Sequence, residues 1–522
     1  MIPRPFASPL LMAAVLGGAV ACALAASAYD GYDDGIEALT RGPIHEAFAH
    51  PVSPDDGDRY IVPQRPPDPI DELPPDVKPA GDNIVWISGY WLYDDDFGDF
   101  VWISGCWRAV PPGRSWIPGY WRETASGHEW IAGFWKDADT RKIVYLPQPP
   151  ETLEQAPPSA VAYEDRVWVE GTWVWQPATL FRSGRYAWRP GFWLQARPDW
   201  IWVPAHYVLT PHGYVFVDGY WDYTLERRGT VFLPVRFPQR TYVQTRIRFS
   251  PSLVIEIGFL TRDLFCSPRR HHYFFGDYHA VQYVTAGYHP WFEQSGRKRS
   301  YDHIFVHEQW RHRDDHAWAQ KQKSDYERRR DHSEERPPRT YREMEARAAQ
   351  RPEPERKDVR AARPLKDVVQ AKESRVTFEK LDPQRREEAA SRGGKLGTYR
   401  EERSRWETPA KQPEPTPTRK PEATPARKPE ATQTRQPEPT PARQPEATPA
   451  RQPEAAGRQS QAAPASREKP HTVRPPESPV VSGPRRAGGA AAPPATPAMP
   501  KANPKPNPRE PREPDGGRRG RR

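Results

Sequence analysis

A six-residue pattern that returns at a fixed interval decides the fold of this chain. It reads Trp-Ile-Ser-Gly-Cys-Trp at 102–107, Trp-Ile-Pro-Gly-Tyr-Trp at 116–121 and Trp-Ile-Ala-Gly-Phe-Trp at 130–135. These copies begin 14 residues apart, a spacing that suits one strand of about eight residues and a turn. Trp, Tyr, Ile and Val favour strands, and turn-type residues such as those at 125–127 separate the copies. The pattern therefore predicts a mainly β fold, an antiparallel meander.

The same pattern extends to both sides of this stretch and forms two blocks. Sixteen of the 20 tryptophans lie between Trp86 and Trp221. In the seventh copy, Ala205 and Tyr207 stand where Gly and Trp are expected. The repeat tryptophans, predicted to be structural, are Trp86, Trp91, Trp102, Trp107, Trp116, Trp121, Trp130, Trp135, Trp168, Trp173, Trp188, Trp193, Trp202 and Trp221.

The glycine inside each copy is predicted to mark a β-bulge. Two tryptophans five residues apart would point to opposite faces of a regular strand, and one extra residue at a bulge would return them to the same face. In the alternative, Pro118-Gly119 forms a hairpin tip that places Trp116 opposite Trp121. We favour the bulge, because a type II Pro-Gly turn splays a two-residue hairpin. The predicted bulge glycines are Gly89, Gly105, Gly119, Gly133, Gly171, Gly191 and Gly219.

The repeated signature resembles the WxxGxW (or YxWGxW) repeat family of exported bacterial proteins, most of which have no assigned function. The resemblance covers residues 86–221, and the segment 146–150 (Leu-Pro-Gln-Pro-Pro) also looks like longer members. The resemblance implies an exported protein of the bacterial envelope. Because the family has no established catalytic residues, the resemblance assigns none to this sequence.

The N-terminal residues also indicate export. Arg4, an apolar run at 10–25 and Ala-Ser-Ala at 26–28 form a signal peptide over residues 1–28, with lipoprotein processing at Cys22 as the alternative. No later stretch is apolar enough for a membrane helix, so the mature chain is expected to lack a transmembrane segment. We expect the periplasm, the cell envelope or the extracellular space as the location.

Composition divides the rest of the chain into segments. Residues 29–80, with 12 Asp or Glu against 4 Lys or Arg, are predicted to be an acidic, Pro-rich, extended leader. Repeat block 1 spans 81–146, a Pro-rich linker 147–162, and repeat block 2 with further strands 163–295; the folded region is expected to end near Trp291. Residues 296–407 are predicted to be charged and partly disordered, with sparse helices at 302–331, 340–350 and 383–407.

The C-terminal residues 408–522 repeat a Pro-rich octapeptide and carry 22 Lys or Arg against 11 Asp or Glu. Proline at this density favours an extended, solvated chain. The sequence therefore predicts a long, disordered, basic tail.

Four histidines form the best candidate metal site. His303 and His307, and then His312 and His316, are each spaced to share one helix face, an arrangement that zinc or copper would accept. Solvated surface side chains are the alternative interpretation. The sequence contains no phosphate-binding loop, nucleophile elbow or cysteine-centred site. We therefore expect that the protein is not an enzyme and that it has no cofactor.

Two classes of function remain. The first is an envelope-associated structural or scaffolding protein whose basic tail contacts anionic polymers. The alternative is a module that binds envelope polysaccharide on exposed indoles, and metal binding by the histidines is a remote third. So many rings cannot all be exposed without forming an aggregation patch, so most are expected in the core. Self-association is compatible with either class, and nucleic acid is not expected as a partner of an exported protein.

Overall fold

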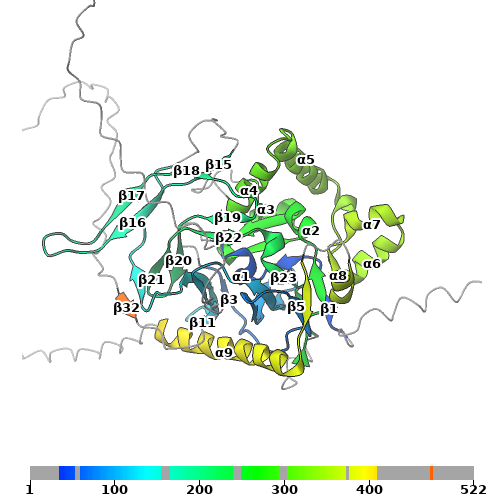
Figure 1. Ribbon diagram of the computed structural model, residues 1–522, viewed down its shortest axis with the longest axis horizontal. Helices are drawn as coiled ribbons and strands as arrows, with labels where there is room; N and C mark the ends of the chain where they lie inside the picture. Colours follow the sequence, from blue (N-terminus) through cyan, green and yellow to red (C-terminus); the bar gives the residue numbers. More distant parts are fainter. Residues whose placement is uncertain are drawn as a thin grey trace, which may run out of the picture.

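The computed structural model describes residues 35–52, 59–154, 165–238, 248–293, 302–371, 376–407 and 471–473. The predicted signal peptide and all of the predicted basic tail except 471–473 lie outside the described residues. Strands of residues 84–137 and 200–223 lie toward the middle of the body, strands of residues 166–195 project at the left side, and the longer helices lie at the edges (Figure 1).

Each pair of repeat copies forms one long antiparallel hairpin that is interrupted halfway. In module 1, β7 (Tyr90–Asp94) pairs with β8 (Asp99–Ile103), and β6 (Ile84–Ile87) pairs with β9 (Cys106–Ala109). In modules 2, 3 and 4, too, the two inner strands pair with each other and the two outer strands pair with each other. Module 2 consists of β10 (Arg114–Ile117), β11 (Tyr120–Thr124), β12 (Gly127–Ile131) and β13 (Phe134–Asp137), and module 3 of β15 (Arg166–Val169), β16 (Thr172–Gln176), β17 (Arg185–Arg189) and β18 (Phe192–Gln195). Module 4 consists of β19 (Trp200–Val203), β20 (His206–Thr210), β21 (Gly213–Val217) and β22 (Tyr220–Tyr223).

The repeat tryptophans meet in pairs across these hairpins. In module 1, Trp86 lies opposite Trp107 and Trp91 opposite Trp102, with ring centroids 5.2 Å apart in both pairs and an edge-to-face arrangement. All 14 predicted tryptophans belong to such pairs, seven in total. In the degenerate seventh copy, Tyr207 lies opposite Phe216. The antiparallel strands expected from the repeat are therefore confirmed.

The glycines interrupt both strands of a hairpin at the same level. Residues 88–89 separate β6 from β7, and residues 104–105 separate β8 from β9. A bulge would add one residue to a single strand, so the interruption differs in detail from the predicted bulge. The hairpin-tip alternative is wrong, because Trp116 lies opposite Trp135. We call each pair of facing interruptions a junction.

Close packing explains why the junction residue is glycine. A Cβ on Gly105 would lie 2.5 Å from Cζ2 of Trp86 and 2.6 Å from the carbonyl oxygen of Ile87. A Cβ on Gly119 would lie equally close to Trp130, and one on Gly133 equally close to Trp116. An indole from one copy thus packs directly on the glycine of the partner copy.

The acidic leader is part of the folded body, which corrects the prediction of an extended segment. Helix α1 (Glu46–Ala49) is buried, and Phe48 belongs to the main hydrophobic core. The leader strands pair with distant ones: β1 (Glu37–Ala38) with β24 (Val235–Arg236), β2 (Gly42–Pro43) with β28 (His272–Phe275), β3 (Ile61–Val62) with β12, β4 (Asp71–Glu72) with β25 (Arg248–Phe249), and β5 (Val77–Pro79) with β31 (Phe378–Lys380).

The fold also continues well past Trp291, where it was expected to end. Helices are present in all three ranges where they were predicted, but the range 302–331 holds two of them, α4 (His303–Arg311) and α5 (Trp318–Asp331), separated by residues 312–317. The other two are α6 (Tyr341–Ala349) and α9 (Pro383–Glu407). Between α6 and α9 lie α7 (Glu353–Val359), β30 (Ala362–Pro364) and α8 (Leu365–Gln370). Helix α9 buries Leu396 and Tyr399 in the main core. No helix of the described residues combines the length and apolar character needed to span a membrane.

Further strands and short helices complete the body. They are β14 (Ile143–Leu146), β23 (Gly229–Val231), β26 (Leu253–Ile255), α2 (Ile257–Arg262), β27 (Leu264–Ser267), α3 (Val281–Thr285), β29 (His289–Pro290) and β32 (His471–Val473). Strand β32, from the segment predicted as a disordered tail, pairs with β14. Cys106 is a buried free thiol, and Cys266 is also free.

A buried carboxylate closes each of the first two junctions. Glu72 accepts hydrogen bonds from the amides of Gly89 (2.7 Å) and Gly105 (2.9 Å) and from Nε1 of Trp102 (2.9 Å). Glu46 accepts from the amides of Gly119 (2.9 Å) and Gly133 (3.0 Å). These acids come from the leader, outside the repeat. Burial raises the pKa of Glu72 to about 7, and the three donors oppose that rise.

Junctions 3 and 4 vary this arrangement. In junction 3, Glu154 from the linker accepts from the amide of Gly171 and from Nε1 of Trp168, both at 2.6 Å. In junction 4, where Ala205 replaces a glycine, Asp218 accepts from the adjacent amide of Gly219 at 2.9 Å. In every junction, therefore, a carboxylate accepts a hydrogen bond from at least one glycine amide.

Arginines bind the carbonyl groups that the interruptions leave without strand partners. Arg400 of α9 donates to the carbonyls of Ser88 (3.2 Å) and Gly89 (3.0 Å). Arg403, also of α9, donates to the carbonyls of Pro118 (2.7 Å) and Ala132 (3.0 Å). Buried backbone groups need such partners, because each unsatisfied one costs about 1–3 kcal/mol. The leader and α9 thus supply the side chains that make the interruptions tolerable.

We predict that Gly105→Ala destabilises the fold by about 1–3 kcal/mol, because its methyl group would overlap the Trp86 indole. Gly394→Ala in α9 is the matched control, since its Cβ would meet nothing within 4 Å, and it should be neutral or stabilising by up to about 1 kcal/mol. Urea unfolding of both variants measures the difference. Equal stability of the two would contradict the packing explanation.

We also predict that Glu72→Gln lowers the free energy of unfolding by about 1–3 kcal/mol. Both oxygens of Glu72 accept hydrogen bonds from N–H groups, so the amide nitrogen of Gln would face a donor with a donor. Glu123→Gln is the control, because Glu123 is exposed on β11. Chemical denaturation of the two variants tests this, and a loss in both or in neither would count against the role of Glu72.

Candidate binding pocket

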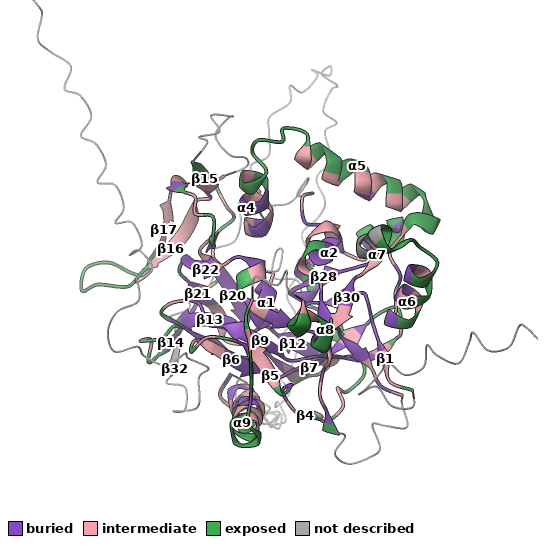
Figure 2. Cartoon of the chain, turned by 45° about the vertical axis from the view of Figure 1, so that its right-hand side comes forward, coloured by how far each residue is buried: buried purple, intermediate pink, exposed green. Residues whose placement is uncertain are grey.

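Burial differs sharply between the two repeat blocks. In block 1 every repeat tryptophan except the half-buried Trp121 is buried. In module 3, the tryptophans at 168, 173, 188 and 193 are all half-buried, and this module is coloured mainly as intermediate and exposed in Figure 2. Block 1 is therefore core, whereas module 3 presents its rings partly to solvent.

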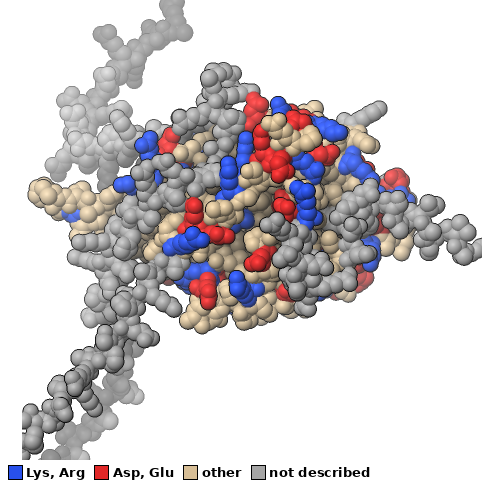
Figure 3. Space-filling view, turned by 90° about the horizontal axis from the view of Figure 1, so that it is seen from below, with Lys and Arg blue, Asp and Glu red and all other residues tan. Residues whose placement is uncertain are grey.

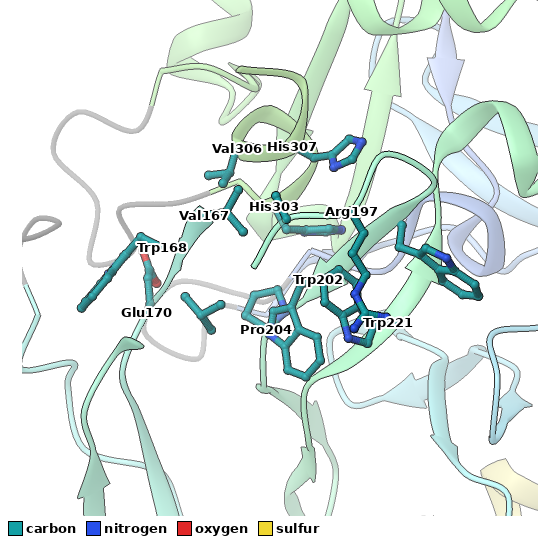
Figure 4. Close-up of a pocket in the computed structure, with 13 residues that line it drawn as sticks. Val167, Trp168, Glu170, Arg197, Trp202, Pro204, Trp221, His303, Val306 and His307 are labelled. Carbon is teal, nitrogen blue, oxygen red and sulfur yellow. The ribbon is translucent and has the colours of Figure 1, made fainter. Parts of the chain in front are cut away.

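A pocket lies where modules 3 and 4 meet α4. Its enclosed cavity volume is about 30 Å³, room for one or two water molecules, and it opens to solvent, so a larger ligand would pack on its open side. Figure 4 shows His303 and His307 of α4 on one side and Trp202, Pro204 and Trp221 of module 4 on another. The lining residues are Val167, Trp168, Val169, Glu170, Ala196, Arg197, Trp200, Trp202, Pro204, Trp221, His303, Val306 and His307.

Aromatic rings form much of the pocket wall. Trp202 and Trp221 meet edge to face, with centroids 5.3 Å apart. The guanidinium of Arg197 lies 4.8 Å from the ring centre of Trp221, a cation–π contact. Trp200 is half-buried and stacks on Tyr223 at 4.6 Å. The wall thus offers several flat apolar surfaces held in place by their neighbours.

Three buried nitrogen atoms at the pocket have no hydrogen-bond partner within the described residues. They are Nε1 of Trp202 and Nε2 of His303 and of His307. Within the described residues the indole nitrogens of Trp86, Trp116 and Trp130 in block 1 are also without a partner, so the Nε1 of Trp202 shares a feature of the repeat. Native proteins satisfy nearly all buried polar groups, so the two imidazole nitrogens are the atoms that indicate a place for a ligand or for water at this pocket. These three residues all line the pocket, and the pocket therefore combines apolar faces with unused hydrogen-bonding groups.

Both imidazoles are neutral at pH 7. Burial, with the nearby His50 and Arg228 adding to it, holds the pKa of His303 well below its usual value. Burial and the charge of Arg311 lower the pKa of His307 to about 4. A neutral imidazole has one donor and one acceptor nitrogen, so the pocket can bind hydroxyl groups without needing a charged partner.

The four histidines of the candidate metal site are not brought together. His303 and His307 line the pocket, but His312 stacks on Trp318 at 4.7 Å and its Nδ1 lies 2.9 Å from the carbonyl oxygen of Glu308. His316 is exposed after the end of α4. Within the described ranges, no group of three or more His, Cys, Asp or Glu side chains is placed to hold a metal ion.

Sequence reasoning missed several residues of the pocket and of the junctions. Trp200 and Arg197 lie between two repeat copies, and the junction acids Glu46 and Glu72 lie in a segment that looked like a solvated leader. No local pattern indicates these roles, because each depends on contact with a distant segment. The Trp-rich composition of 168–202 was the one available signal.

The comparisons with known proteins agree with the module boundaries. The family model described as WXXGXW repeat (2 copies) matches residues 81–108, 116–136, 167–193 and 197–222. Each match falls on one of the four modules, which contain two copies each. No curated protein and no solved structure matches this chain.

Proposed function

We propose that this WXXGXW-repeat protein is a non-catalytic, carbohydrate-binding protein of the bacterial envelope. The observation that supports this most is the pocket in which half-buried indoles stand beside orphaned nitrogen atoms of Trp202, His303 and His307. Block 1, whose repeat tryptophans are buried apart from the half-buried Trp121, is the structural scaffold in this proposal.

The chemistry of the pocket suits a sugar ring better than other small molecules. A pyranose has an apolar C–H face, which packs on an indole, and hydroxyl groups around its edge, which both donate and accept hydrogen bonds. The pocket has the matching groups in the ring of Trp200, the N–H of Trp202 and the neutral imidazoles. Arg197 and Glu170 also line it, with opposite charges. We therefore propose a neutral saccharide unit of an envelope polysaccharide as the ligand.

Export is a second part of this proposal. The signal-peptide pattern of residues 1–28 would place the chain where envelope polysaccharides occur. That segment lies outside the described residues.

We predict that the protein binds an envelope polysaccharide and that Trp200→Ala weakens this binding about fivefold to tenfold, the equivalent of losing one stacking contact. His307→Phe should also weaken it, because the ring volume is kept but both nitrogen atoms are lost. Trp173→Ala is the matched control, since Trp173 is half-buried in module 3 but does not line the pocket. Calorimetric titration with a panel of glycans measures the affinities.

No binding across the panel would contradict the proposal. An equal loss in the Trp173 and Trp200 variants would move the site away from the pocket. Circular dichroism of each variant separates a lost contact from a lost fold.

We expect the difference in affinity between the unchanged protein and His307→Phe to be constant from about pH 8 to about pH 5.5 and to fall near pH 4; taking this difference removes the effect of Asp302, the N-cap of α4, whose pKa burial raises to about 6. His307, with its lowered pKa of about 4, gains a proton there and loses its acceptor nitrogen, whereas an ordinary histidine would titrate near 6.5. Titration of the folded protein in buffers across this range gives the profile. A midpoint of this pH dependence near pH 6.5 would contradict the lowered pKa of His307.

A scaffolding role is the second candidate function. Its support is the buried aromatic core of block 1 and the basic composition of 408–522, with 22 Lys or Arg against 11 Asp or Glu. In this role the tail contacts anionic envelope polymers, and its binding is sensitive to salt.

A further inference from the structure

The hairpin of module 3 ends in a tight turn with two large apolar residues at its point. Thr179 and Arg182 bond to each other on either side of the turn, with N–O distances of 2.8 and 3.3 Å. Leu180 and Phe181 are the two central residues, with 90% and 94% of their surfaces exposed. They are the most exposed large hydrophobic residues in the part of the chain that the structure describes.

Turn chemistry does not explain these two residues. Tight turns favour Gly, Asn, Asp and Pro at their central positions. Neither Leu180 nor Phe181 has a positive φ, so neither has a backbone conformation that restricts the choice of residue. Exposed apolar side chains at a protruding point are instead typical of a surface that contacts something apolar.

A rigid stalk holds the tip away from the body. Below the turn, Trp175 and Tyr186 pack edge to face at 5.0 Å, and Trp173 and Trp188 at 5.4 Å. The hydroxyl of Tyr186 donates to the carbonyl of Pro147 at 2.5 Å, and that of Tyr207 donates to the carbonyl of Trp173 at 2.8 Å. The hairpin projects from the side of the molecule in Figures 1 and 2, and its tip stands away from the other labelled helices and strands.

The charge of the hairpin indicates which kind of surface its tip would contact. Residues 171–190 contain Arg182, Arg185 and Arg189 and no Asp or Glu. Arg182 and Arg185, nearest the tip, are exposed, whereas Arg189 pairs with Asp218 at 3.0 Å. Elsewhere on the face shown in Figure 3, basic and acidic side chains are mixed, and the projecting tip is mostly uncharged.

We propose that the β16–β17 tip inserts Leu180 and Phe181 into the surface of a lipid bilayer while Arg182 and Arg185 bind anionic headgroups. Two apolar side chains with cationic groups just behind them match the interface between acyl chains and phosphates. A protein partner is less suited, because a convex two-residue point cannot bury the roughly 800 Å² per partner of a stable protein interface. This role is separate from the pocket and adds attachment to the saccharide binding proposed above.

Vesicle flotation tests this with the mature chain, residues 29–522. We use vesicles of phosphatidylcholine with about one third phosphatidylglycerol, and vesicles of phosphatidylcholine alone. Because the basic tail can also bind anionic lipid, each mixture is measured at low salt and at ~0.5 M NaCl, where charge contacts are screened but apolar insertion persists.

The double variant Leu180→Ser/Phe181→Ser should reduce the partition coefficient at high salt by about tenfold or more, because both inserted side chains are lost. Arg182→Gln/Arg185→Gln should reduce binding to the anionic vesicles at low salt. Val281→Ser is the matched control, since Val281 is 65% exposed on α3, away from the hairpin, and it should bind like the unchanged protein.

Two outcomes would overturn the proposal. One is a Leu180/Phe181 variant that partitions like the unchanged protein at both salt concentrations. The other is unchanged vesicle binding combined with the loss of a concentration-dependent dimer in light scattering, which would make the tip a contact between copies of this chain.

Discussion

The fold depends on carboxylates buried against the glycine amides of the repeat. Each hairpin is interrupted where an indole packs on a glycine, and the interruption leaves amides and carbonyls without strand partners. Glu72 and Glu46 accept the amide hydrogens of junctions 1 and 2, and Arg400 and Arg403 donate to the carbonyls. In junctions 1 and 2, charged side chains from outside the repeat therefore compensate for the hydrogen bonds that the indole packing interrupts. This explains how an aromatic repeat, an acidic N-terminal segment and a basic helix form one folded unit.

The question of whether the tryptophans are core or binding surface has a different answer in each block. In block 1, the leader strands and α9 cover the hairpins, so that Trp86, Trp102 and Trp135 are buried. Module 3 has Glu154 at its junction, but among the described residues no comparable segment covers its outer strands, and its rings are half-buried. One pattern therefore serves as core or as surface according to what packs on it. Whether neighbouring segments cover a repeat hairpin therefore determines whether its tryptophans form core or surface.

The local features of the fold could be predicted and the long-range ones could not. The period of the repeat indicates the strands and turns, and charge patterning indicates helices at 341–349 and 383–407. Interior glycines also show where the strands are interrupted. Composition misleads, however, wherever a charged residue has a buried partner: Glu46 and Arg403 look like solvated side chains until their backbone partners are known. The pocket was equally hidden, because Trp200 and His307 are more than one hundred residues apart in the chain.

The origin of the junction acids limits how such a protein can evolve in length. In solenoid proteins each repeat stacks on the next through contacts within the repeat, so units can be gained or lost. Here the duplication of a two-copy unit would add a junction but no acid to fill it, because Glu46 and Glu72 lie in the leader and Glu154 in the linker. A new unit would have to recruit its own acid, as the fourth has done with Asp218 inside its own sequence. Growth by simple duplication is therefore costly, and the number of units is tied to the segments that surround them.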